Sequence, residues 1–90
     1  MKKYIDPFLI NLPSIDLHGY DKVSSIIKVD EFINDSLKLK KYKIVIIHGK
    51  GKGILKEEIH KYVKKDKRVL RYYLDINIGS TIVELESSKR

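Results

Sequence analysis

Hydrophobic and polar residues follow three different spacings along the first half of the chain. Ile15 and Leu17 alternate with polar neighbours over residues 14–18, which predicts a short strand. Residues 44–47 are apolar without interruption, as in a central strand of a covered sheet. The segment between these strands predicts a helix that begins after an N-cap at Asp21 and runs to about residue 39. Its expected apolar face consists of Val23, Ile26, Ile27, Ile33 and Leu37.

The second half of the chain predicts one more helix and two more strands. The helix is expected over residues 54–65, and the strands over residues 69–74 and 81–85. A turn at residues 77–80 should join these two strands into an antiparallel hairpin. The order β-α-β-α-β-β predicts an α/β fold with right-handed crossovers and one mixed four-stranded sheet, on which two helices pack. The apolar side of the second helix is expected to consist of Leu55, Ile59, Tyr62 and Val63.

The length of 90 residues allows a single domain with a modest core. Residues 1–13, interrupted by Pro7 and Pro13, are expected to form an N-terminal arm, residues 14–86 the domain, and residues 87–90 a C-terminal tail. The sequence has no cysteine, no apolar run long enough to span a membrane, and a poor match to a signal peptide. We therefore expect a cytoplasmic protein without disulfides, thiolate metal sites or a membrane partner.

Positive charge is concentrated in the middle of the chain. The sequence has 19 Lys and Arg residues against 12 Asp and Glu residues, a net charge of +7. Residues 38–71 hold 13 of the basic residues and 3 of the acidic ones, so this block carries +10 and the two flanking segments are slightly acidic. A basic block of this kind attracts polyanions, above all nucleic acid. The alternative is that lysine only keeps the surface solvated.

The first candidate site lies at residues 16–19, Asp-Leu-His-Gly, where the first strand ends. Residues two apart in a strand share a face, so Asp16 and His18 should project together while Leu17 enters the core. A neighbouring carboxylate can orient an imidazole for proton transfer, which makes this pair the candidate catalytic residues. The alternative is that Asp16 only caps a turn and His18 only bonds a backbone carbonyl.

The second candidate site is a glycine-rich loop between a strand and a helix. Its glycines allow close approach of a ligand, and the helix N-terminus and lysines that follow favour a phosphate. The glycine spacing matches neither a Walker A loop nor the Rossmann fingerprint, so a phosphate of a polymer backbone is the better interpretation. The alternative is a flexible loop with solvated lysines. The candidate phosphate-binding residues are His48, Gly49, Lys50, Gly51, Lys52 and Gly53.

If the first two strands are neighbours, both candidate sites meet at one end of the sheet, and Asp16, His18, His48 and Lys52 could surround one phosphate. We expect no structural metal and no required cofactor, with a divalent cation such as Mg²⁺ only as an optional helper. His60 is expected to face solvent, because it lies off the apolar side of its helix.

Three motifs in this order resemble those of the Smr (small MutS-related) domain family. Residues 15–19, Ile-Asp-Leu-His-Gly, are similar to the family's Leu-Asp-Leu-His-Gly signature. Residues 48–51, His-Gly-Lys-Gly, are similar to its His/Thr-Gly-X-Gly signature, and residues 79–85 resemble its closing Gly-Ala-Thr-hydrophobic strand. The resemblance covers about residues 12–86. It departs from the family at Ser24 and Ser25, where Glu-Ala is common, and at residues 77–80, which hold less glycine than usual.

The resemblance implies a two-layer α/β fold similar to the C-terminal domain of translation initiation factor three. It implies an endonuclease that nicks DNA or cleaves messenger RNA at stalled ribosomes, with Asp16 and His18 in cleavage and residues 49–51 in nucleic-acid binding. DNA repair or recombination and ribosome rescue are the processes it suggests. The alternative functions are a non-catalytic nucleic-acid-binding module and a ribosome-binding module. A monomer is expected in either case.

Overall fold

The computed structural model describes residues 12–51, 53–76 and 79–87. Its six elements are β1 Ser14–Asp16, α1 Lys22–Lys38, β2 Lys43–Ile47, α2 Ile54–Lys65, β3 Val69–Leu74 and β4 Ser80–Leu85. The predicted order of elements is confirmed, although β1 ends at Asp16 and not at His18, where the alternation had predicted its end. Ser80, expected in the turn, begins β4 because it pairs with Ile47 of β2. Asn77 and Ile78, and all of the predicted arm and tail except residues 12, 13 and 87, lie outside the described residues.

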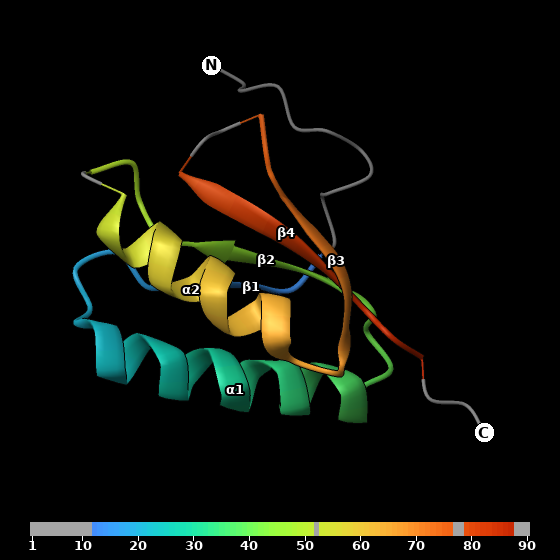
Figure 1. Ribbon diagram of the computed structural model, residues 1–90. Coiled ribbons are helices and arrows are strands. Elements are labelled where there is room, and N and C mark those ends of the chain that lie inside the picture. The colour runs from blue at the N-terminus through green and yellow to red at the C-terminus, as the bar shows by residue number, and fades with distance from the viewer. Residues whose placement is uncertain (1–11, 52, 77–78, 88–90) are drawn as a thin grey trace, which may run out of the picture.

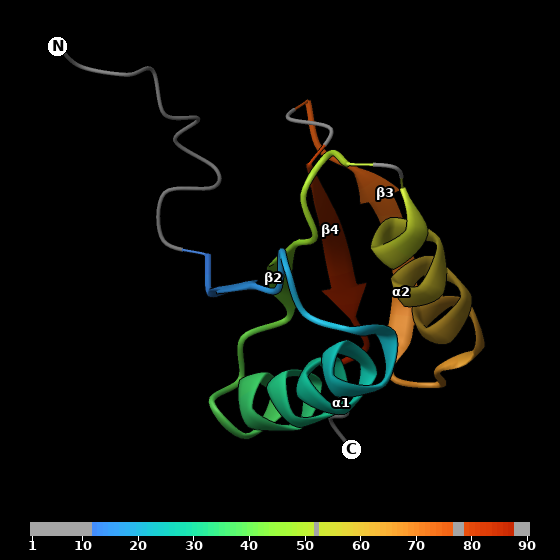
Figure 2. The ribbon, with the colours of Figure 1, turned by 90° about the vertical axis from the view of Figure 1, so that its left-hand side faces the viewer.

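The sheet has the strand order β1-β2-β4-β3. β1 runs parallel to β2, whereas β4 is antiparallel to both of its neighbours. The last strand of the chain is thus inserted between β2 and β3, and this makes the sheet mixed, as predicted. Figures 1 and 2 show that α1 and α2 lie on the same face of the sheet, so the domain has two layers.

The core lies between that face of the sheet and the two helices. Ile44 and Ile46 of β2 point toward the helices, together with Val83 and Leu85 of β4. Leu17, directly after β1, is fully buried, as its alternation with Asp16 and His18 predicts. Fully buried side chains from the helices complete the core: Val29 and Ile33 of α1, and Ile59 and Val63 of α2.

The predicted apolar face of α1 is wrong at its N-terminal half. Val23 and Ile27 are 72% and 53% exposed, whereas the buried positions are Ser25, Val29, Ile33 and Ser36. Burial of Ser25 is tolerated because its hydroxyl donates a hydrogen bond of 2.8 Å to the Lys22 carbonyl. The predicted N-cap is confirmed, since the Asp21 carboxylate accepts a hydrogen bond of 2.7 Å from the Ser24 N–H.

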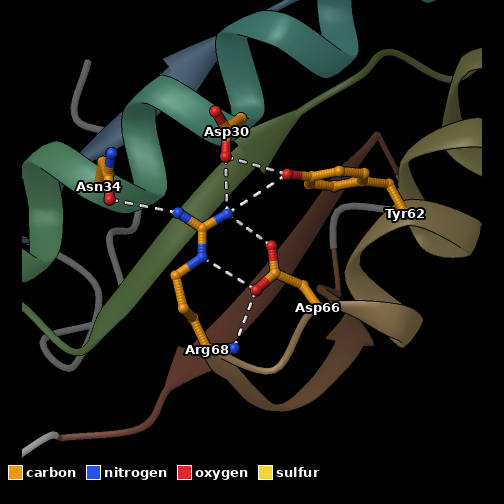
Figure 3. Close-up of polar contacts among 5 residues, drawn as sticks. All are labelled: Asp30, Asn34, Tyr62, Asp66 and Arg68. Carbon is orange, nitrogen blue, oxygen red and sulfur yellow. Dashed lines mark hydrogen bonds and ion pairs between the residues drawn. The ribbon is translucent and has the colours of Figure 1, made fainter.

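A polar cluster around Arg68 joins α1, α2 and the segment before β3 (Figure 3). The Arg68 guanidinium donates to both carboxylate oxygens of Asp66, at 2.9 and 2.6 Å, and to Asp30 of α1 at 2.8 Å. The Tyr62 hydroxyl of α2 donates to Asp30 at 3.1 Å. Burial, followed by the hydrogen bond to Asp30, raises the pKa of Tyr62 to about 12. Arg68 therefore helps to hold the two helices together.

Candidate functional site

The segments that follow β1 and β2 lie side by side at one end of the sheet (Figure 1). The Leu17 N–H donates to the Ile47 carbonyl at 2.7 Å, which continues the pairing of the two strands beyond β1. Gly49 approaches His18 so closely that a Cβ atom built on it would lie 3.3 Å from the Cβ of His18. The two candidate sites predicted from the sequence therefore meet.

Asp16 and His18 form an exposed carboxylate–imidazole pair. Asp16 Oδ1 lies 2.6 Å from His18 Nδ1 and also accepts a hydrogen bond of 3.1 Å from the His18 backbone N–H. Because an ionised carboxylate can only accept, His18 Nδ1 must carry the proton of this bond, and Nε2 is the nitrogen left for proton exchange. The two side chains remain 52% and 72% exposed, so a ligand can reach the ring.

This pairing shifts the two pKa values in opposite directions. The hydrogen bond to Asp16, reinforced by its negative charge, raises the pKa of His18 above 6.5. The hydrogen bonds from the His18 ring and backbone lower the pKa of Asp16 below 3.8. Asp16 is thus ionised at neutral pH, and His18 changes charge at a pH somewhat higher than a free histidine would.

The glycine-rich loop forms one wall of a pocket that is also lined by Gly19, the residue after His18. Gly49 and Gly53 have left-handed backbone conformations, with φ of 88° and 80°. Gly53 is also the N-cap of α2. Because glycine has no side chain, no N-cap side chain bonds the first N–H groups of α2. The pocket measures about 250 Å³, and its lining includes Tyr20, His48, Gly49, Gly51, Gly53 and Lys56.

The lysines at this pocket differ in part from those expected. Lys50 is exposed beside the glycines, whereas Lys52, expected to bind phosphate, lies outside the described residues. Lys56 lines the pocket from the first turn of α2, although the sequence reasoning did not single it out. Lys56 could have been predicted from the sequence, because it follows the last glycine of the loop by three residues and therefore lies on the first turn of the predicted helix.

His48 lines the pocket but is almost fully buried in its wall. Its side chain is buried, Nδ1 lies 3.0 Å from the Gly49 carbonyl oxygen, and Nε2 lies 2.8 Å from Thr81 Oγ1. Burial lowers the pKa of His48 below 6.5. Both ring nitrogens are thus occupied within the chain in this conformation, which leaves neither free for the phosphate expected from the sequence.

The expectation that His60 faces solvent is wrong. His60 is half-buried, its Nε2 lies 2.7 Å from Thr81 Oγ1, and its ring meets that of Tyr72 edge-on at 5.0 Å. The reason is that α2 packs against β3 as well as α1, so residues beside its main apolar stripe are also covered. Nothing in the sequence spacing pairs His60 with Thr81.

Within residues 12–51, 53–76 and 79–87, no group of three His, Cys, Asp or Glu side chains could hold a metal ion. Over the same ranges, no helix is long and apolar enough to cross a membrane.

These observations define a class of protein: a two-layer α/β domain that holds an exposed carboxylate–imidazole pair against a glycine turn. The chain belongs to the Smr domain family, whose sequence profile matches residues 15–86. This finding confirms the resemblance of the three motifs.

Relatives with known names support the same assignment. The chain is 34% identical over 76 residues to endonuclease MutS2 of Brevibacillus brevis and 39% identical over 75 residues to that of Acetivibrio thermocellus. These alignments cover 80% and 79% of this chain but only 10% of each relative. The chain therefore spans about a tenth of the length of these curated relatives.

Solved structures agree with the fold. The Smr domain of Thermus thermophilus MutS2 superposes with a TM-score of 0.81 at 26% identity, over 83% of this chain and 99% of that one. YdaL, a stand-alone small MutS-related protein from Escherichia coli, superposes with a TM-score of 0.77 at 22% identity, over 81% of this chain and 63% of that one.

Proposed function

We propose that this domain binds nucleic acid at the end of the sheet formed by β1 and β2 and cleaves its phosphodiester backbone there. The observation that carries the proposal is the 2.6 Å contact between Asp16 Oδ1 and His18 Nδ1, which leaves His18 Nε2 for proton exchange in a residue whose Cβ lies against Gly49. Proton transfer by a positioned histidine is a common means of accelerating phosphodiester cleavage. The name endonuclease, borne by MutS2 relatives, supports the same reaction.

In the proposed reaction, neutral His18 takes a proton at Nε2 from the attacking oxygen as that oxygen bonds to phosphorus. Asp16 holds the ring and stabilises the imidazolium that results. On RNA, the 2′-hydroxyl would attack and the 5′-oxygen would leave, taking a proton from a water molecule, which gives a cyclic phosphate and a free 5′-hydroxyl. On DNA, a water molecule would attack instead, and a sugar oxygen would leave with a proton from a second water molecule. Loop N–H groups and Lys50 or Lys56 would stabilise the charge that develops on the phosphoryl oxygens.

We propose that the reaction needs no organic cofactor and that a single chain suffices, with Mg²⁺ as an optional helper. Asp16 and His18 with one or two lysines provide a proton acceptor and positive charge without a further group. Cytoplasmic action, in DNA repair or recombination or in ribosome rescue, is the setting that we expect.

A second candidate function is a nucleic-acid- or ribosome-binding module that does not cut. The observation that favours it is the charge of +10 within residues 38–71, which attracts phosphates without any need for Asp16. The two functions differ in one respect that can be measured: only in the nuclease does removal of Asp16 slow cutting strongly while binding stays intact.

The test uses end-labelled single-stranded RNA, single-stranded DNA and branched DNA, each with and without Mg²⁺. Wild-type protein is compared with the double variant Asp16→Ala/His18→Ala. We expect cutting of at least one substrate that disappears in the variant while binding persists. Salt-sensitive binding without cutting in any lane would favour the binding module, and cutting that persists in the variant would remove the pair from the mechanism.

A further inference from the structure

Three polar side chains from different segments meet beneath the glycine-rich loop. The Thr81 hydroxyl of β4 lies 2.8 Å from Nε2 of His48, which follows β2, and 2.7 Å from Nε2 of His60 in α2. Thr81 is fully buried, His48 is 5% exposed, and His60 is half-buried. The reaction proposed above uses none of these three side chains.

The direction of each hydrogen bond follows from the Gly49 carbonyl oxygen, which can only accept. His48 Nδ1, 3.0 Å away, must therefore donate, so that Nε2 of a neutral His48 is an acceptor. The Thr81 hydroxyl then donates to His48 and accepts from His60, whose Nε2 carries a proton. Burial lowers the pKa of both histidines, which favours their neutral forms.

This chain of hydrogen bonds fixes the orientation of the peptide group between residues 49 and 50. The carbonyl of that peptide, from Gly49, accepts a hydrogen bond from His48 Nδ1. The preceding peptide is also held, because the Gly49 N–H donates to the Gly79 carbonyl at 2.9 Å. In a trans peptide the C=O and N–H bonds point in opposite directions, so the N–H of Lys50 points away from the buried His48 ring. Gly49, the residue directly before this N–H group, lies against the Cβ of His18.

We propose that His60, Thr81 and His48 form a directional hydrogen-bond relay, His60 to Thr81 to His48 to Gly49, whose members are positioning residues for the loop. The relay turns the peptide between residues 49 and 50 so that its N–H group is available to a phosphoryl oxygen beside His18. The role of this N–H group at a phosphate rests on the proposed function. The protonation pattern of the two histidines is independent of the proposed function.

The first test needs no variant and no substrate. Long-range ¹H–¹⁵N correlation spectra of the wild-type domain, at a pH where both rings are neutral, show which nitrogen of each histidine carries the proton. We expect Nδ1–H for His48 and Nε2–H for His60. An Nε2–H form of His48, or an Nδ1–H form of His60, would overturn the relay.

Matched variants test its effect on the loop. Thr81→Val removes the hydroxyl at nearly constant shape, whereas Thr81→Ser keeps it. His60→Leu removes the donor, whereas His60→Gln retains an N–H group of similar reach. We expect Thr81→Val and His60→Leu to accelerate amide hydrogen exchange of His48 and Gly49 by about tenfold, and the retaining variants to stay near wild type. Equal exchange in all four variants would overturn the relay.

Cutting assays on the same variants separate the relay from the proposed function. We expect Thr81→Val to reduce the cutting rate by about tenfold to a hundredfold at saturating substrate, and Thr81→Ser to restore it. Equal rates in these two variants would contradict the role of the relay in cutting. If wild-type protein cuts no substrate but shows the expected protonation pattern, the proposed function fails and the relay stands.

Discussion

At the scale of single residues, the pairing of Asp16 with His18 determines how activity should depend on pH. The contact raises the pKa of His18, so the limb of the pH–rate profile that reports this ring should lie above pH 6.5. Asp16→Asn removes the negative charge, and the pKa of His18 should then fall toward its ordinary value. We expect this limb to move to lower pH, as measured by cutting rates between pH 5 and 9. An unchanged limb would show that another group titrates.

The same pair makes a pH-dependent contribution to stability. The depressed pKa of Asp16 stabilises the fold above the carboxyl's unfolded pKa, and this contribution is lost as pH falls through the folded value. The raised pKa of His18 contributes below about pH 6.5 and is lost as pH rises through its folded value. The contribution is therefore greatest between these limits, in weakly acidic solution.

Two glycines provide a matched comparison at the site. Gly19 and Gly49 both have left-handed φ values, 86° and 88°, so either substitution by alanine strains the backbone by about 1 kcal/mol. Only at Gly49 does the added methyl also press on His18, at 3.3 Å. We expect Gly49→Ala to lose roughly 1 kcal/mol more stability than Gly19→Ala in urea unfolding, and to lose more cutting. Equal losses would show that close packing of Gly49 on His18 is unimportant.

At the scale of elements, alternation and helical spacing were sufficient to predict all six segments and their order. The ends of β1 and β2 were expected to meet only if the two strands are neighbours, and the strand order shows that they are. The buried face of α1 was not predictable in the same way. Ser25 and Ser36 are polar by type but buried, while Val23 and Ile27 are exposed, because contacts with the sheet and α2 decide which face is covered.

The residues of the candidate site were likewise only partly predictable from local sequence. Asp16 ends β1 and His18 follows two residues later, so their proximity follows from local geometry. The contact of His48 and His60 with Thr81 joins residues 33 and 21 positions apart, and no local pattern indicates it. His48 was therefore interpreted as a phosphate ligand, although its ring nitrogens bond the Gly49 carbonyl and Thr81.

The Arg68 cluster should stabilise the fold by more than an ordinary surface ion pair does. Arg68 makes charged hydrogen bonds to Asp66, directly after α2, and to Asp30 of α1, so Arg68→Ala should lower the free energy of unfolding by about 2 kcal/mol. Arg71 is a matched control, because its side chain is mostly exposed where it pairs with Glu84. This ion pair should therefore contribute less than about 1 kcal/mol to the free energy of unfolding. Urea unfolding of Arg68→Ala and Arg71→Ala provides the comparison. A smaller loss for Arg68→Ala would contradict this role.

At the scale of the whole molecule, the fold divides the basic block between two ends of the sheet. Lys50 and Lys56 lie at the end that holds Asp16 and His18. Lys40 and Lys41 precede β2 and therefore lie at its opposite end. Both arginines of the block, Arg68 and Arg71, are paired with carboxylates of the same chain. The net charge alone consequently does not show where a nucleic acid would bind.

Salt dependence of binding distinguishes the two ends. Each phosphate contact that is lost should flatten the slope of log K against log salt by about 0.7 to 0.9. We expect Lys50→Gln and Lys56→Gln to reduce the slope, and the matched changes Lys40→Gln and Lys41→Gln to leave it unchanged. The reverse pattern, measured by fluorescence anisotropy from 50 to 200 mM salt, would move the binding surface away from Asp16.

The central claim is that His18, held by Asp16, transfers the proton during backbone cleavage. The most direct measurement is the single-turnover cutting rate of His18→Gln beside wild type, on the best substrate and with protein in excess over its Kd. We predict that binding stays within about twofold while cutting falls by a factor of at least about a hundred. Cutting by His18→Gln at the wild-type rate would contradict the claim.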